Sequence, residues 1–136
     1  NLEVWPLAAE RGVAELVEDV RQLAAFDLDV IIDFAGFGTT TAGAISAVRP
    51  GGRVVVVGLG RNEATISTAE LVYKSMTLRG SRSGKPGALE SVLALMANGD
   101  LTIHATRIGF DEIPDAIERL KSSHVVGRIA AVMHDD

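Results

Sequence analysis

Two short apolar runs rich in β-branched residues stand out along the chain. The first, residues 28–34, reads LDVIIDF, and the second, residues 53–57, reads RVVVV. Both runs are continuous rather than alternating, which is the pattern of a strand covered on both faces of a sheet. The strong turn signal Pro50-Gly51-Gly52 comes directly before the second run. The pattern therefore predicts two successive buried strands.

Helical spacing lies between these two runs. The spacing of Ala42, Ile45 and Val48 places them on one face of a helix that ends at about Val48. Thr39 or Thr40 can cap the start of this helix. Four further helices are expected, each from a start or stop signal or an apolar stripe: Pro6 to about Arg11, ended by Gly12; Ser67 or Thr68 to about Lys74; Pro86 to Gly99, with Leu89, Val92, Leu93 and Met96 on one side; and a helix capped by Asp111, with Ile113, Ile117 and Leu120 facing inward.

Two more segments have strand character. Residues 75–81, SMTLRGS, predict a strand that ends at Gly80, and residues 125–133, VVGRIAAVM, predict a strand that closes the chain. Residues 14–20, AELVEDV, fit a short strand and a helical turn equally well. Strands that alternate with helices indicate an α/β fold built around a largely parallel sheet.

Composition narrows the possible functions. The chain has 136 residues, of which 47% are hydrophobic, and a net charge of −5, so it has no general electrostatic reason to bind nucleic acid or an anionic membrane. No apolar run is long enough to span a bilayer. Because the chain has no cysteine, it can form neither a disulfide nor a thiolate metal site. This composition fits a cytoplasmic protein.

Each of the first two strands ends in a glycine pair. These are Gly36-Phe37-Gly38 and Gly58-Leu59-Gly60, and neither completes the G-x-G-x-x-G fingerprint of a dinucleotide-binding loop. One interpretation is that the glycines only let the strands stop and the loops turn. The other is that they form a floor for a flat cofactor, because ligands of open parallel sheets bind at the carboxyl ends of strands. The pattern alone leaves both open.

Other polar candidates are weaker. Asp33 lies inside an apolar strand and needs partners, either as a structural acceptor of backbone and hydroxyl donors or as a general base. His104, His124 and His134 lack ligand spacing, so surface or cap roles are expected. Residues 81–85, SRSGK, resemble an anion-binding turn but lack the frame of a P-loop.

The order of these segments resembles that of a known family. The sequence resembles the C-terminal portion of medium-chain dehydrogenases/reductases, and most closely their zinc-dependent alcohol dehydrogenase branch, from about Val4 to Met133. The resemblance is carried in order by DVIIDFAG at 29–36, RPGGRVVVVGL at 49–59, MTLRGS at 76–81, NGDL at 98–101 and VVGRIAAV at 125–132.

The resemblance implies a division of the chain. Residues 1–80 would form the second half of a dinucleotide-binding Rossmann domain, and residues 81–136 would return toward the catalytic domain. In this family the glycine-rich phosphate loop, the acidic ribose-binding residue and the zinc ligands precede the matched region. The chain is accordingly expected to start just after the second strand of the cofactor domain. Gly58 would then close the fifth strand and would not belong to the phosphate loop.

The resemblance also implies cofactor-binding residues. The contacts to the nicotinamide half come from the ends of three strands, and a basic residue in the last strand reaches the pyrophosphate. Arg82 is larger and more charged than expected beside a nicotinamide. No catalytic or metal-binding residue is expected within this chain. The implied set is Phe34, Ala35 and Gly36; Val57, Gly58 and Leu59; Ser81, Arg82 and Ser83; and Arg128.

The function implied is hydride transfer between a small alcohol or aldehyde and NAD, with NADP also possible and with zinc held by the intact parent. Two alternatives stay open: a zinc-free quinone or enoyl reductase of the same superfamily, and a non-catalytic nucleotide-binding domain. The chain alone is expected to be inactive. A homo-oligomer is also expected. It would form through the strand at 29–34, which would lack its Rossmann neighbour and present a flat, apolar edge, or through the edge of the strand at 76–80.

Overall fold

The computed structural model describes residues 2–122 and 125–133, and the chain forms two compact units. One unit runs from Glu15 to Ser83, and the other joins the residues up to Ala14 with those from Gly84 onward. The division into residues 1–80 and 81–136 concerns the domains of a longer enzyme and stays a prediction.

The unit from Glu15 to Ser83 is built on a three-stranded parallel sheet. Its strands lie in the order β1 (Val30–Asp33), β2 (Arg53–Val56) and β3 (Thr77–Gly80). The register places Ile31 beside Val54, and Val54 beside Leu78. The α/β class, the parallel sheet and these three predicted strands are confirmed, although each strand is shorter than its apolar run.

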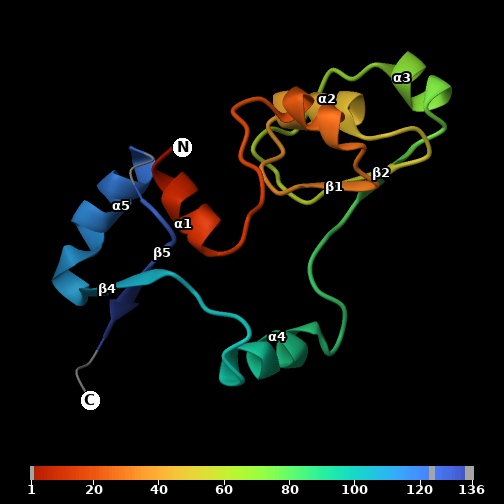
Figure 1. The fold of residues 1–136 in the computed structure, drawn as a ribbon. Helices are drawn as coiled ribbons and strands as arrows, with labels where there is room; N and C mark the ends of the chain where they lie inside the picture. The colour runs from red at the N-terminus through yellow and green to blue at the C-terminus, as the bar shows by residue number, and fades with distance from the viewer. Residues whose placement is uncertain (1, 123–124, 134–136) are drawn as a thin grey trace. The chain divides into compact units, whose positions relative to one another are not determined.

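Helix α2 (Thr39–Ala47) packs against one face of this sheet (Figure 1). Ile45 and Val48 are fully buried there together with Val54. On the opposite face, Val30 and Ile32 of β1 are 49% and 50% exposed. The expectation that both faces of the first strand are covered is therefore wrong in this unit, because α2 covers one face only.

Lys74 closes the carboxyl end of α2. Its Nζ donates to three backbone oxygens, those of Ile45 at 2.9 Å, Ser46 at 2.6 Å and Val48 at 3.0 Å. The last carbonyls of a helix lack partners within the helix and carry partial negative charge, so an ammonium group is well suited to this position. The contact also fixes the residue that follows α3 (Thr68–Tyr73) beside α2.

The ends of α3 and the segment before β1 follow local capping rules. The Glu70 amide donates to Ser67 Oγ at 3.2 Å, which confirms the predicted start of α3. The ambiguous residues 14–20 form neither a strand nor an α-helix. They lead into a 3₁₀ helix, η2 (Val20–Phe26), which is capped by Asp19.

The second unit pairs two parallel strands, β4 (Ala105–Gly109) and β5 (Arg128–Val132). β5 was predicted, but β4 was not, because Ile108 is its only buried residue and its sequence carries little apolar signal. The helical elements of this unit are η1 (Leu2–Val4), α1 (Trp5–Glu10), α4 (Ala88–Ala97), η3 (Phe110–Glu112) and α5 (Ile113–Lys121).

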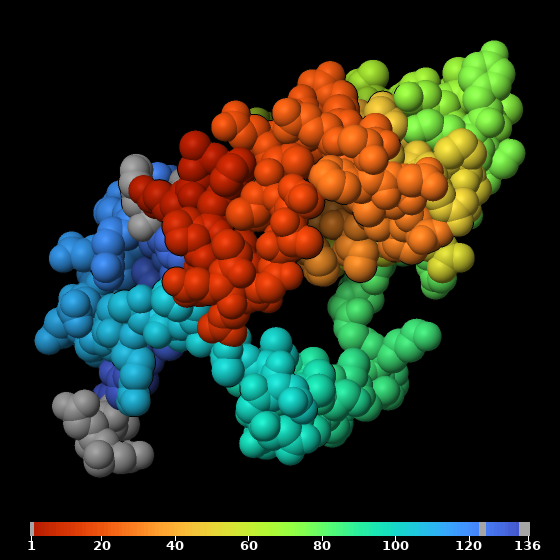
Figure 2. Space-filling view, in the orientation of Figure 1, coloured from red at the N-terminus to blue at the C-terminus, as the bar shows by residue number. Residues whose placement is uncertain are grey.

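Helices α4 and α5 form where they were predicted, but their apolar stripes are not covered within this unit. Leu89 and Leu93 of α4 are 67% and 53% exposed, and the helix lies at the surface in Figure 2. In α5 the buried residue is Ala116, while Ile117 and Leu120 are exposed, so their predicted inward orientation is wrong.

The start of α5 also differs from the prediction. Asp111 lies within η3, and Glu112 precedes the helix directly. The Glu112 carboxylate accepts a hydrogen bond from the Gly109 amide at 2.7 Å. None of the helices within residues 2–122 and 125–133 is long and apolar enough to cross a membrane.

Candidate functional site

The strands β1 and β2 end side by side, and the loops that follow them are joined to each other. We call residues 34–38 and 57–61 the paired loops. Their main chains meet directly, as adjacent parallel strands require at their carboxyl ends. Four backbone hydrogen bonds connect β1 and its loop to the second loop: Val57 N to Asp33 O at 2.9 Å, Gly58 N to Asp33 O at 3.0 Å, Gly60 N to Ala35 O at 3.0 Å, and Arg61 N to Gly36 O at 2.8 Å.

Two of the predicted cofactor-binding residues are the glycines that allow this approach. A Cβ added to Gly58 would lie 2.3 Å from Phe34 O, and one added to Gly36 would lie 2.0 Å from Gly58 O. Gly36 also has a φ of +62°, a conformation that side chains disfavour. The space beside both glycines is filled by the opposite loop. A side chain at either position would therefore collide with the opposite loop, and the contact of these residues with a cofactor stays a prediction.

The paired loops instead present apolar side chains to solvent. Phe34 is 73% exposed, Phe37 is 55% exposed and Leu59 is 85% exposed, and Val57 is also exposed. We call these four side chains the apolar loop surface. Exposed aromatic and aliphatic side chains that lie together are a feature of ligand and partner sites in soluble proteins. Phe37, the member that the sequence interpretation did not include, follows Gly36 directly.

Asp33 lies at the last position of β1, directly before Phe34. Its carboxylate accepts hydrogen bonds from the amides of Ala35 at 3.0 Å and Gly36 at 2.9 Å, from Thr40 Oγ1 at 3.0 Å and from Thr41 Oγ1 at 2.7 Å. The side chain is buried. This arrangement confirms the interpretation of Asp33 as a structural acceptor of backbone and hydroxyl donors.

These donors hold Asp33 in its ionised form. Burial by itself would raise the pKa of Asp33, but the hydrogen bonds from Gly36, Thr41, Thr40 and Ala35 act in the opposite direction. The net result is a pKa of Asp33 below that of an ordinary aspartate. A carboxylate in this state is a poor general base at neutral pH, because it has little affinity for a proton.

Thr40 therefore has a different role from the predicted one, which was to cap α2. Gly38 occupies the cap position of α2, and no side chain caps the helix there. The hydroxyl of Thr40 donates to Asp33 and accepts from the Phe37 amide at 3.2 Å. The prediction that Thr39 or Thr40 caps α2 is wrong because the Thr40 hydroxyl is used to anchor the end of β1 instead.

The remaining predicted residues are placed differently. The Ser81 amide donates to Val56 O at 2.9 Å, so residues 81–83 start beside the end of β2, and all three are exposed. Arg128 begins β5 in the other unit, where its amide donates to His104 O at 2.9 Å. The structure thus brings residues 34–36 together with residues 57–59, and Ser81 next to them, within one unit.

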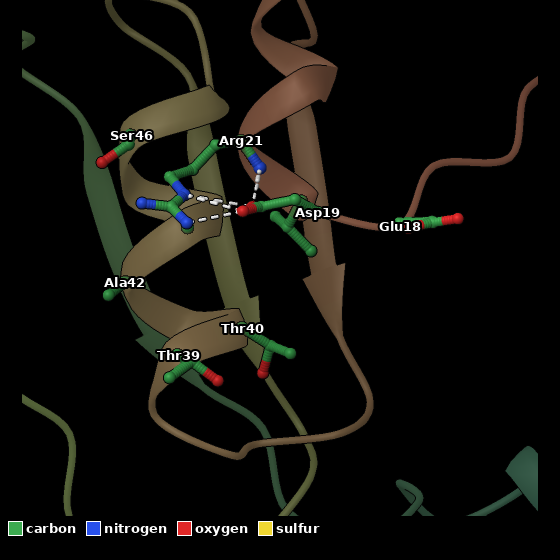
Figure 3. A pocket seen from close by; sticks show the side chains of 9 residues that line it. Glu18, Asp19, Arg21, Thr39, Thr40, Ala42 and Ser46 are labelled. Carbon is green, nitrogen blue, oxygen red and sulfur yellow. Dashed lines mark hydrogen bonds and ion pairs between the residues drawn. The ribbon is translucent and has the colours of Figure 1, made fainter. Parts of the chain in front are cut away.

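One cavity was not foreseen from the sequence. It lies between η2 and α2 with a volume of about 420 Å³, and Figure 3 shows two of its lining residues, Arg21 and Asp19, paired with each other. The hydrogen bonds from Arg21 lower the pKa of Asp19 to about 2. Gly43 of α2 lies where η2 packs closely on this helix, since a Cβ there would lie 3.2 Å from Val20 Cβ. The cavity contains none of the predicted cofactor-binding residues.

Metal ligation finds no support in this part of the protein. Within the described residues, no three histidine or acidic side chains are grouped so that they could hold a metal ion. His104 contributes its backbone oxygen to the sheet, as described above, and His124 and His134 lie outside the described residues. The described residues thus do not fit a zinc site.

Comparison with known proteins gives a consistent picture. A family model described as zinc-binding dehydrogenase matches residues 6–98. The probable cinnamyl alcohol dehydrogenase 3 of Oryza sativa subsp. japonica is 27% identical over 119 residues, which cover 88% of this chain and 32% of that protein. An alcohol dehydrogenase of Moraxella sp. is 31% identical over 86 residues, covering 63% of this chain and 25% of that protein.

Solved structures agree with the fold. The alcohol dehydrogenase of the archaeon Aeropyrum pernix superposes with a TM-score of 0.87 at 25% identity, over 98% of this chain and 41% of that one. The acetophenone reductase of Geotrichum candidum, solved in complex with NAD, shares the fold with a TM-score of 0.82 at 22% identity, over 96% and 39% of the two chains. The chain spans about a third of the length of the curated relatives it matches.

Proposed function

Since this chain belongs to the zinc-binding dehydrogenase family, we propose that it forms the nicotinamide-facing half of a cofactor domain in an NAD-dependent alcohol dehydrogenase. The activity proposed is hydride transfer between a small alcohol or aldehyde and the cofactor. Relatives named as alcohol dehydrogenase and as D-xylulose reductase support this substrate class. NADP is the alternative cofactor.

The observation that carries this proposal is the apolar loop surface at the carboxyl ends of two adjacent parallel strands. This is the edge at which open α/β sheets bind ligands. The nicotinamide ring, when bound, supplies the hydride chemistry. The chain's own residues bind and orient that ring. Backbone hydrogen bonds of the residues on either side of Phe34 and Leu59 hold the two loops against each other.

We propose that each group of residues contacts a different part of the cofactor, according to its position in the fold. Those on the paired loops contact the ring, those after β3 contact its carboxamide, and the residue that begins β5 contacts the pyrophosphate. The proposed contact residues are Phe34, Ala35, Gly36, Val57, Gly58 and Leu59; Ser81, Arg82 and Ser83; and Arg128.

Two further features belong to the same proposal. Among the described residues β1 pairs with β2 alone, so its outer edge is open to another strand. An open edge with Val30 and Ile32 exposed supports a homo-oligomer. A cytoplasmic location rests on the cysteine-free composition.

The proposal is tested by mapping NADH on the isotope-labelled 136-residue chain by amide NMR. We expect NADH at millimolar concentrations to shift the amides of residues 34–37 and 57–60 first. The amides around Asp19 and Ala42, which line the cavity between η2 and α2, serve as an internal control and should stay in place. Shifts confined to that cavity, or no shifts at all, would contradict the proposed function.

A further inference from the structure

A single residue, Asp33, connects the two paired loops with the start of α2. The Asp33 carboxylate contacts the first of the paired loops through Ala35 and Gly36, and the start of α2 through Thr40 and Thr41. Its backbone oxygen accepts the first two amides of the second loop. Asp33 thus contacts both loops and the helix that covers the sheet.

The acceptor positions of the Asp33 carboxylate are all occupied by donors from the protein. Its two oxygens receive two amide and two hydroxyl donors, and the Thr40 hydroxyl lies 3.0 Å from both oxygens. A carboxylate has about four acceptor sites, and all are used here. No buried side-chain nitrogen or oxygen within residues 2–122 and 125–133 lacks a partner. Asp33 is therefore an anchor and not a proton acceptor for a substrate.

The conformation that Asp33 anchors is one the loop does not favour by itself. Gly36 is buried and left-handed, and its backbone lies against that of Gly58. Without the carboxylate, the amides of Ala35 and Gly36 lose their acceptor, and a buried amide without a partner is costly. The loop would then open toward solvent to regain hydrogen bonds, and Phe34, directly beside Asp33, would leave its place next to the second loop.

We propose that Asp33 is a positioning residue for the nicotinamide cofactor: it sets the conformation of the first loop, which carries Phe34, against the second loop, which carries Leu59. This inference rests on the proposed function. It goes further by assigning the conformation of the first loop to one buried carboxylate and two threonine hydroxyls, in addition to the glycines that let the two loops approach each other.

The test compares NADH binding to four variants of the chain, measured from the resonances of folded molecules only. Asp33→Asn should bind NADH about tenfold more weakly, since an amide cannot replace a carboxylate that accepts four donors. Asp29→Asn is the matched control, because Asp29 directly precedes β1 and its carboxylate accepts from Arg49 Nε at 2.8 Å. It should bind NADH like the unmodified chain.

A second pair of variants covers the case in which Asp33→Asn does not fold. Thr41→Val removes one donor with little change in shape and should weaken binding, while Thr41→Ser keeps the hydroxyl and should restore it. A purely structural role for Asp33 would lower the folded fraction but leave the affinity of folded molecules unchanged, and that result overturns the positioning role alone. Absence of NADH binding to the unmodified chain would overturn the proposed function, and the positioning role with it.

Discussion

At the scale of single residues, the paired loops show how a glycine can be essential without leaving space for a ligand. The position that a Cβ would take at Gly58 is already occupied by the backbone of residues 34–35. Two backbones approach this closely only where side chains are absent. The space that a side chain at residue 58 would occupy is filled by the backbone of the first loop.

Gly58→Val should consequently destabilise the folded protein, by forcing the two loops after β1 and β2 apart, in addition to weakening cofactor binding. Since the new Cβ would lie 2.3 Å from Phe34 O, we expect a loss of about 3 kcal/mol in the free energy of unfolding, measured by urea titration. Gly80→Ala is the control, because a Cβ at Gly80 meets nothing within 4 Å. Equal stability of the two variants would show that the paired loops are not in close contact.

The lowered pKa of Asp33 predicts how the free energy of unfolding depends on pH. Its pKa is lowered in the folded state, so the unfolded chain binds this proton more readily. The stabilisation is complete above the pKa of an unfolded aspartate, about 3.9, and is lost as the pH falls through the lower folded value. Urea midpoints measured across this range should fall more steeply for the unmodified chain than for Asp33→Asn. If the urea midpoints of the two proteins changed with pH to the same extent, the lowered pKa of Asp33 in the folded state would be contradicted.

At the scale of elements, the sequence predicted strands more reliably than it predicted what covers them. The runs before Gly36 and Gly58 form β1 and β2 because β-branched residues fit a pleated, half-buried surface. Their continuity indicated burial on both faces, yet Val30 and Ile32 are half exposed. Coverage depends on which other elements pack on the sheet, and a local pattern does not contain that information.

The ends of β1 and β2 were predictable from the sequence, but the contacts made by the loops that follow them were not. The G-x-G sequences correctly marked where β1 and β2 end, because parallel strands end at a common edge. The use of Thr40 and Thr41 to anchor Asp33 depends on contacts seven and eight residues apart in the chain. The hydrogen bonds between the two loops join residues about 25 positions apart, such as Arg61 and Gly36. Strand β4 was missed because it buries one side chain, that of Ile108.

The ammonium group of Lys74 should be a large contributor to the stability of α2. Lys74→Met keeps most of the side chain but removes the donor to three helix-end carbonyls, and we expect a loss of about 2 kcal/mol in the free energy of unfolding. Lys121→Met is the matched control. Lys121 forms an exposed ion pair with Glu118, which should contribute little. If both variants unfold at the same urea concentration, the capping role is wrong.

At the scale of the whole molecule, the described sheet ends at β1 on one side and at β3 on the other. The free edge of β1 carries Val30 and Ile32 without a lysine or proline to prevent pairing. We expect the chain to associate at high micromolar concentration in sedimentation experiments. Ile32→Lys should shift it toward monomer, whereas Val72→Lys on α3, also at an exposed position, should not. A monomer at all concentrations would contradict the use of this edge.

Catalysis by the chain alone is not expected. The described residues include no metal-binding group, and the sequence has no G-x-G-x-x-G loop to hold the phosphates. The purified chain with NAD and ethanol should therefore produce no NADH above the background of a buffer blank, measured by absorbance. Sustained turnover that copurifies with the chain would show that the catalytic residues are present after all.

The central claim is that the paired loops bind the nicotinamide end of the cofactor, and saturation-transfer NMR on NADH tests it most directly. Saturation of the protein's methyl groups passes to those ligand protons that lie against its surface. The apolar loop surface carries the methyl groups of Val57 and Leu59, so the nicotinamide protons should receive more saturation than the adenine protons. Stronger transfer to the adenine protons would place the cofactor elsewhere on the chain and contradict the account.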